Sequence, residues 1–192
     1  MTALADIQRR VGVTPDGRWG PNTADAIAKA LGMLSEPVRA SDIPADYWPM
    51  LSKIESGDRP YVKASSSSAS GLFQFIKSTW IAEGGKWGND PNLAFGGLKP
   101  SEAEQLARAV TFTEKNAAFL KRQGIPINRA SLYAAHFFGA GVAAKVIKAD
   151  VNARADLLAG DAATKANPSI LRGKTVGEFL TWLHKKTGEW AR

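Results

Sequence analysis

The sequence predicts a mainly α-helical protein, and three observations support this fold class. Apolar residues recur every three or four positions in several segments, and helix-capping residues stand at a number of their ends. No strand-like alternation of useful length competes with them, although we expect a short hairpin near 60–75. The expected helices occupy residues 4–11, 23–31, 47–55, 101–124, 129–149 and 175–190.

Start and stop signals justify individual helices. Asn22 or Thr23 offers an N-cap for the second helix. Ser101 precedes a long periodic run, and Glu104 follows three residues later, which is the spacing of a capping box. Gly124 ends the same run, because glycine readily adopts the left-handed conformation that closes many helices.

The last expected helix, 175–190, carries an apolar stripe with lysines on its other faces. Such a stripe suits a membrane-disrupting helix, but it is also what any helix docked on a globular core requires. Acidic residues dilute its positive face, which favours docking. We therefore predict that it packs on the protein core through Phe179, Leu183 and Trp190.

Composition limits the chemistry that the chain can perform. Its 192 residues, 44% of them apolar, are enough for one medium domain with a small module. There is no cysteine, so neither a disulfide framework nor a thiolate metal site can form. His136 and His184 are the only histidines and cannot make a zinc cage by themselves. We expect no metal and no cofactor.

A net charge of +7 favours a polyanionic partner, such as nucleic acid, anionic cell wall or an anionic membrane surface. No recognised nucleic-acid motif accompanies the charge, so we expect no nucleic-acid binding. No run of eighteen apolar residues and no signal-peptide pattern is visible. These features predict a soluble protein that is made in a cytoplasm, and we expect it to be a monomer.

The chain divides where two prolines and small polar residues interrupt the helical patterns, near residues 35–46. This predicts a small helical module over 1–36, a linker over 37–45 and a larger domain over 46–192. A unit as short as the first one buries little surface, so we expect it to depend on the larger domain for stability.

The small module contains the stretch DGRWG, which is Asp16, Gly17, Arg18, Trp19 and Gly20. Aspartate and glycine are typical of a tight turn, and the tryptophan can fill the gap between two helices. Together with the periodic segments around it, the stretch resembles the peptidoglycan-binding helical domain of many cell-wall hydrolases. The resemblance covers about residues 4–34 and implies a wall-binding role for these five residues.

Glu55 stands near the C-terminal end of an expected helix, where the helix dipole disfavours an anion. An arbitrary glutamate there is a surface carboxylate, but three ordered blocks surround this one: IESG at 54–57, SSSSASGLFQ at 65–74 and AAHFFGAG at 134–141. In this order they resemble the signature blocks of soluble lytic transglycosylases, which share a lysozyme-like helical fold with goose-type lysozyme. With the module in front, the chain resembles a modular phage endolysin.

The resemblance, which covers about residues 46–150, implies site residues. Glu55 takes the position of the catalytic acid. His136 stands where the family usually has a tyrosine beside that acid, so it either holds and polarises Glu55 or is an ordinary packed core residue. Thr113 stands where the family tends to keep an asparagine. The residues implied to bind substrate are Ser65, Gly71, Phe73, Gln74, Tyr133 and His136.

Conventional glycosidases flank the bond with two carboxylates, but the acids after Glu55 do not reproduce that arrangement. A transglycosylase can use one glutamate, first as an acid kept protonated by an apolar pocket and then as a base. The expected reaction cleaves the β-1,4 bond between N-acetylmuramic acid and N-acetylglucosamine and leaves a 1,6-anhydro ring. If water enters instead, the same site hydrolyses the bond as a muramidase.

Two further classes of function remain open. A non-catalytic wall-binding protein is compatible with the DGRWG turn and the positive charge, and a membrane-active protein is compatible with the basic last helix. For the enzyme we expect the glycan strand of peptidoglycan as partner, and contact with an anionic outer-membrane surface as a further partner. An endolysin would accumulate in the host cytoplasm and reach the cell wall after release by a holin-type protein.

Overall fold

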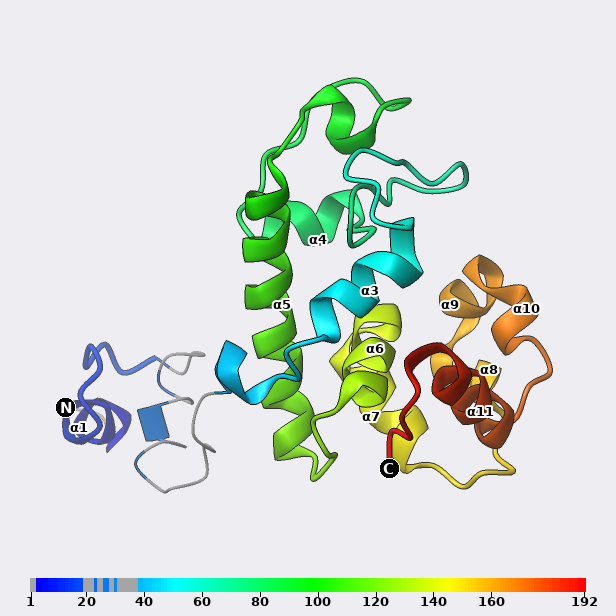
Figure 1. Cartoon of the computed structure of the whole chain (residues 1–192). Helices are drawn as coiled ribbons and strands as arrows, with labels where there is room; N and C mark the ends of the chain where they lie inside the picture. Colours follow the sequence, from blue (N-terminus) through cyan, green and yellow to red (C-terminus); the bar gives the residue numbers. More distant parts are fainter. Residues whose placement is uncertain (1–2, 19–22, 24–25, 28–29, 31–37) are drawn as a thin grey trace. The chain divides into compact units, whose positions relative to one another are not determined.

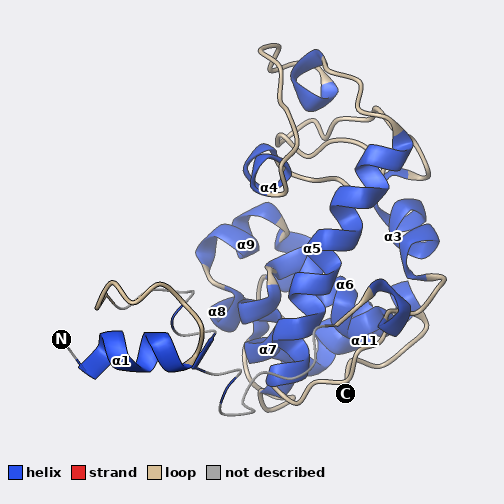
Figure 2. Ribbon diagram, turned by 90° about the vertical axis from the view of Figure 1, so that its left-hand side faces the viewer, coloured by secondary structure: helices blue, strands red, loops and turns tan. Residues whose placement is uncertain are grey.

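The computed structural model describes residues 3–18, 23, 26–27, 30 and 38–192. The chain forms two compact units, Met1–Pro37 and Val38–Arg192. The described residues form about ten α-helices and no β-sheet, so the predicted mainly α fold class is confirmed (Figure 1, Figure 2). None of the described helices is long and apolar enough to cross a membrane.

In the first unit, helix α1 (Ala3–Arg10) leads into the turn that contains Asp16 and Gly17. Gly17 has a φ of +69°, a left-handed conformation that glycine adopts without the steric penalty of a side chain. The Asp16 carboxylate accepts a hydrogen bond from the backbone N–H of Arg18 at 2.9 Å, which helps to lower its pKa. The predicted residues Trp19, Gly20 and Asn22 lie outside the described part of the chain.

Gln8 organises this turn from a buried position on α1. Its side-chain nitrogen lies 2.8 Å from the Asp16 carboxylate, 2.9 Å from the Arg18 carbonyl and 3.0 Å from the Thr23 hydroxyl. Its side-chain oxygen accepts a hydrogen bond from the backbone N–H of Gly17 at 2.8 Å. One amide therefore joins the helix, the turn and the following helical residue Thr23.

In the second unit, α6 packs against α5, α7 and α11, and α8 to α10 continue from α7. The segment between α3 and α5 gathers toward one end of α5, and α6 to α11 gather toward the other (Figure 1, Figure 2). The elements are η1 (Ala40–Asp42), α3 (Tyr47–Ser56), α4 (Lys77–Ala82), η2 (Ala94–Gly97), α5 (Glu102–Arg122), α6 (Arg129–Phe138), α7 (Ala140–Lys148), α8 (Ala155–Ala159), α9 (Asp161–Ala166), α10 (Pro168–Leu171) and α11 (Val176–Thr187).

Val38 and Ile43 fall within the stretch expected to be a linker, 37–45, yet both side chains are buried in the core of the second unit. Two apolar side chains removed from water add stability to the unit that buries them. The second unit therefore begins at Val38 and includes most of that stretch.

Several helix ends agree with the sequence signals. The Ser101 hydroxyl accepts a hydrogen bond from the Glu104 backbone N–H at 3.1 Å, as predicted. One predicted helix is wrong, because the segment 129–149 divides at Gly139 into α6 and α7. Gly139 has a φ of +81° and a ψ of 149°, which no residue inside an α-helix has.

The hairpin expected near 60–75 is present as isolated antiparallel bridges, between Lys63 and Ser70 and between Ser70 and Phe75. The serine run inside it is folded rather than free. The Ser67 hydroxyl accepts a hydrogen bond from the Ala69 backbone N–H at 3.1 Å, and further backbone hydrogen bonds close the hairpin. The run is therefore not a flexible linker, as predicted.

The last helix, α11, packs on the core through Phe179 and Leu183, which are fully buried as predicted. The third predicted contact, Trp190, is wrong, because its side chain is 51% exposed. α11 ends at Thr187 and Gly188 takes a left-handed conformation, so Trp190 no longer follows the helical stripe. Its ring stacks instead on His184, with 4.3 Å between the ring centroids.

Candidate active site

Glu55 lies in the last turn of α3, and Gly57 ends the helix in a left-handed conformation. Tyr47, Leu51 and Glu55 are spaced by four residues, so they share one face of the helix. Tyr47 and Leu51 are buried, and Glu55 at the end of this face is half-buried. The apolar face of α3 therefore carries a carboxyl group to the edge of the core.

The surroundings of Glu55 favour its protonated form. Burial raises the pKa of the carboxyl group to about 7, against an ordinary value of 4.5. A hydrogen bond from Tyr133 and the positive charge of Lys186 on α11 both oppose this shift, but burial has the larger effect. Near neutral pH the group is therefore poised between acid and base, which is the property a general acid–base catalyst requires.

Two tyrosines face this carboxyl group. Burial and the charge of Glu55 raise the pKa of Tyr133 on α6, so its hydroxyl keeps its proton and can donate a hydrogen bond to Glu55. Burial and the same charge raise the pKa of Tyr47, whose hydroxyl is hydrogen-bonded to the side chain of Thr113 on α5. Helices α3, α5, α6 and α11 thus all contribute groups to one polar cluster.

Tyr47 is a residue that the sequence-based reasoning missed. The available signal was its position eight residues before Glu55, which places both side chains on the same helix face. Thr113 was noted only as a departure from a family pattern, and its burial and its bond to Tyr47 show a structural connection to the site.

His136 is bonded to and packed against residues outside the polar cluster. Its side chain is hydrogen-bonded to the backbone of Phe73, and its ring meets the rings of Phe75 and Phe112 edge-on, at centroid distances of 5.8 and 6.0 Å. Burial lowers the pKa of His136 to about 4, so the ring is neutral at pH 7. Of the two interpretations of this residue, the structure favours the packed core residue, and Tyr133 is the tyrosine that contacts Glu55.

Gly71 and Phe73 support the hairpin from inside. Phe73 is only 3% exposed, so its ring belongs to the core and not to an open apolar surface. Gly71 has a φ of +79°, and an added Cβ would lie 2.3 Å from Gln105 Oε1 and 2.4 Å from Phe95 Cζ. The same Gln105 oxygen accepts a hydrogen bond from the Leu72 backbone N–H at 2.8 Å. Both residues hold the shape of the loop.

Gln74 and Ser65 are the more accessible members of the predicted set. Gln74 is half-buried and has a φ of +47°, an uncommon conformation for a residue other than glycine. Its side-chain nitrogen donates hydrogen bonds to the Gly71 carbonyl at 2.9 Å and the Val62 carbonyl at 3.3 Å. Ser65 is exposed at the hairpin loop. Gln74 therefore closes the loop with its amide nitrogen and keeps its amide oxygen for another partner.

The acids that follow Glu55 in sequence have other partners. Asp58 accepts a hydrogen bond from the Ser52 hydroxyl at 2.7 Å, and Asp90 accepts one from the Asn92 backbone N–H at 2.8 Å. Glu83 forms an ion pair with Lys115 at 2.8 Å. In the described part of the chain, no group of three histidine, aspartate or glutamate side chains could hold a metal ion. The candidate site thus centres on one carboxyl group.

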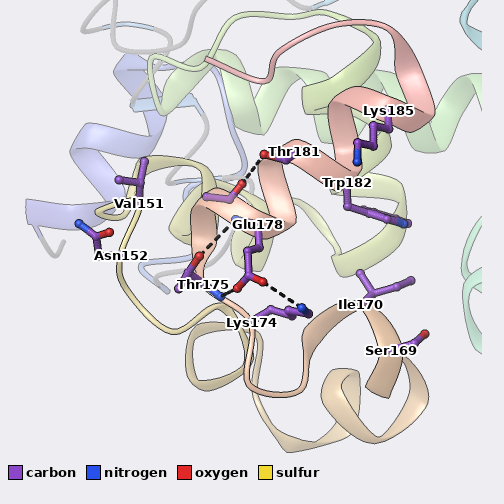
Figure 3. Close-up of a pocket in the computed structure, with 11 residues that line it drawn as sticks. Val151, Asn152, Ser169, Ile170, Lys174, Thr175, Glu178, Thr181, Trp182 and Lys185 are labelled. Carbon is purple, nitrogen blue, oxygen red and sulfur yellow. Dashed lines mark hydrogen bonds and ion pairs between the residues drawn. The ribbon is translucent and has the colours of Figure 1, made fainter.

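Glu55 lines none of three concave regions on the described surface. The largest, of about 550 Å³, lies between α10 and α11 (Figure 3), and the others, of about 330 and 390 Å³, lie beside the hairpin and beside Arg108. Burial and a hydrogen bond, rather than a large cavity, therefore distinguish Glu55 as a candidate catalytic residue.

No known family model matches this sequence, and a search of curated proteins gives no match either. Two observations mark the candidate site. One is the order of the sequence blocks around Glu55, and the other is the cluster that Glu55 forms with Tyr133 and Lys186.

Proposed function

We propose that this protein cleaves the glycan strand of peptidoglycan, between N-acetylmuramic acid and N-acetylglucosamine, as a lytic transglycosylase. The observation that carries the proposal is a single half-buried carboxyl group, Glu55, whose pKa of about 7 lets it serve as acid and as base in turn. The order of the sequence blocks around it and the mainly α fold support the same conclusion.

In the first step, protonated Glu55 donates its proton to the glycosidic oxygen, and the bond from that oxygen to C1 of the muramic acid breaks. The N-acetyl carbonyl oxygen of the same sugar bonds to C1 and stabilises the positive charge. Glu55 is now a carboxylate, and the Tyr133 hydroxyl and the Lys186 charge both favour that form. These two residues therefore lower the cost of the charge that appears during the reaction.

In the second step, the Glu55 carboxylate takes the proton of the C6 hydroxyl of the muramic acid. The C6 oxygen then bonds to C1, the bond from the N-acetyl oxygen to C1 breaks, and a 1,6-anhydro ring forms. Glu55 is protonated again, so the cycle consumes no water and needs no second carboxylate. The other partners of Asp58, Glu83 and Asp90 are compatible with this one-acid route.

Hydrolysis by the same glutamate is the second candidate, because a water molecule can replace the C6 hydroxyl in the second step. Mass spectrometry of the digested glycan distinguishes the two outcomes. Transglycosylation yields anhydro-muramic ends, and hydrolysis yields ends that are heavier by one water.

For the rest of the chain, we propose a lysozyme-like arrangement of the second unit and a wall-binding role for the first. The network around Gln8 holds the turn at Asp16 and Gly17 in a fixed form, as a recognition element requires. The protein would then be a monomeric phage endolysin that accumulates in the host cytoplasm and meets peptidoglycan after holin-type release.

The test is Glu55→Gln, which keeps the size of the side chain and removes the acid. We expect the variant to bind purified cell walls and to lose clearing activity by about a thousandfold or more. Glu102→Gln, at an exposed position in the first turn of α5, is the matched control and should clear walls at the parental rate. A Glu55→Gln variant that clears walls as fast as the parent would contradict an enzymatic function.

A further inference from the structure

The pocket of about 550 Å³ between α10 and α11 has no part in the proposed chemistry. In Figure 3 Asn152 lies at the left of the lining residues, Trp182 and Lys185 lie at the right, and Glu178 lies between them. A volume of this size suits a small ligand or a short peptide. Its lining combines an indole ring with hydroxyl, amide and ammonium groups.

One aromatic ring connects this pocket with the candidate active site. Trp182 lines the pocket, and its ring lies against Tyr133, with 6.0 Å between the ring centroids and 30° between the planes. Tyr133 in turn hydrogen-bonds Glu55. Two neighbouring lysines of α11 form a second link. Lys185 lines the pocket, and the positive charge of Lys186 lowers the pKa of Glu55. The lining of the pocket and the surroundings of Glu55 therefore share helix α11.

The charges of the pocket favour a carboxylate. Lys174 is paired with Glu178 at 2.9 Å, so these two side chains offset each other. Lys185 forms no recorded ion pair among the described residues and adds one uncompensated positive charge. An ammonium group donates to carboxylate oxygens, and the face of Trp182 accepts an aliphatic side chain. The matching ligand is a short acidic peptide with small aliphatic residues.

We propose that this pocket binds the acidic peptide stem that the muramic acid of peptidoglycan carries. This inference rests on the proposed function, because that function places muramic acid at Glu55, and it adds a peptide subsite to the glycan site. The side chain of Lys185 holds a stem carboxylate, and Trp182 packs against the aliphatic part of the stem.

The first test is binding of a free stem, the tetrapeptide L-Ala-γ-D-Glu-meso-diaminopimelyl-D-Ala, which has no glycosidic bond to cleave. Titration into isotope-labelled protein should shift the indole N–H signal of Trp182, which the Trp182→Phe variant assigns. Lys185→Glu should weaken the affinity by about tenfold. Lys145→Glu is the matched control, since Lys145 is also exposed in the last turn of a helix, α7, and does not line the pocket.

An unshifted Trp182 signal, or equal affinities for the parent and Lys185→Glu, would overturn the proposal. The second test compares cleavage of glycan strands with and without their stems. Lys185→Glu should lower kcat/KM on strands with stems about tenfold more than on bare strands. An equal loss on both strands also overturns the proposal. Failure of the parental protein to cleave either strand refutes the proposed function, whereas the titration still decides whether the pocket binds the stem.

Discussion

Around Glu55 the polar side chains come from several helices, whereas in the hairpin of residues 63–75 Ser67 and Gln74 bond to the backbone of the hairpin itself. Tyr133 and Lys186 come from helices far along the chain and meet one carboxyl group. In the hairpin, Ser67 and Gln74 bond to backbone atoms within a few residues. The first arrangement keeps a carboxyl group in surroundings that disfavour its charged form. The second gives hydrogen-bond partners to polar groups that would cost stability if they were left unpaired.

Residues that one motif brings together therefore have different roles. Gly71, Phe73 and Gln74 hold the shape of the hairpin loop, and Gly71 and Phe73 are buried. Glu55, in contrast, combines a raised pKa with a partly accessible position, which is typical of functional sites. Four substitutions test this division between the two regions.

Gly71→Ala should have the largest effect on stability. The new Cβ would meet Gln105 and Phe95 at distances that no structure tolerates, at a φ that alanine rarely adopts. We expect the free energy of unfolding to fall by about 3 kcal/mol, from overpacking and backbone strain together. Urea denaturation followed by circular dichroism measures this. An unfolding free energy equal to that of the parent would show that the hairpin does not depend on the close packing at Gly71.

Glu55→Gln should stabilise the protein at high pH. The pKa of Glu55 is raised from 4.5 to about 7 on folding, so the native state binds the proton more tightly than the unfolded state. The parent therefore loses stability as the pH rises from 4.5 through 7, and the variant lacks this loss. Above pH 7 the variant should be more stable by about 2 kcal/mol.

Denaturation of both proteins across this pH range gives the comparison, and below pH 4 the difference should vanish. If Glu55→Gln is less stable than the parent at pH 8, the fold does not disfavour the charged form of the Glu55 carboxyl group.

Gln74→Ala should have a smaller effect on stability. The substitution removes the hydrogen bonds to the Gly71 and Val62 carbonyls, and we expect a loss of about 1 kcal/mol. Activity should fall strongly, as the sequence resemblance implies. Unfolding free energy and clearing rate, measured on the same preparation, separate the two effects. A near-normal clearing rate would limit Gln74 to closing the loop.

Tyr133→Phe should cause the smallest change, which is a shift to higher pH of the point at which activity declines. The Tyr133 hydrogen bond lowers the pKa of Glu55 against the effect of burial, so its loss raises that pKa further. In the proposed mechanism, activity depends on protonated Glu55 and declines as the pH rises through this pKa, so the decline should move to higher pH. His136→Ala is the control, because His136 is neutral at pH 7 and packs against Phe75. This variant should leave the pH of the decline unchanged. If the decline shifts in the His136 variant and not in the Tyr133 variant, the roles of the two residues are reversed.

The sequence alone determined the mainly α fold class, the N-cap at Ser101 and the buried face of α11. These features depend on interactions within a few residues, which the sequence displays directly. The same local reasoning failed at Gly139 and at Trp190. Helical periodicity continues across both positions in the sequence, but the backbone leaves the helix before or at each of them.

Tertiary packing selects which aromatic residue of α6 contacts Glu55. Tyr133 and His136 lie on the same helix, α6, three positions apart, and their types suit either role. The packing of α6 against α5 and α11 directs Tyr133 toward the carboxyl group and leaves His136 between Phe75 and Phe112. The pKa of Glu55 also depends on burial by distant segments. Such contacts join residues far apart in the chain, and no local pattern specifies them.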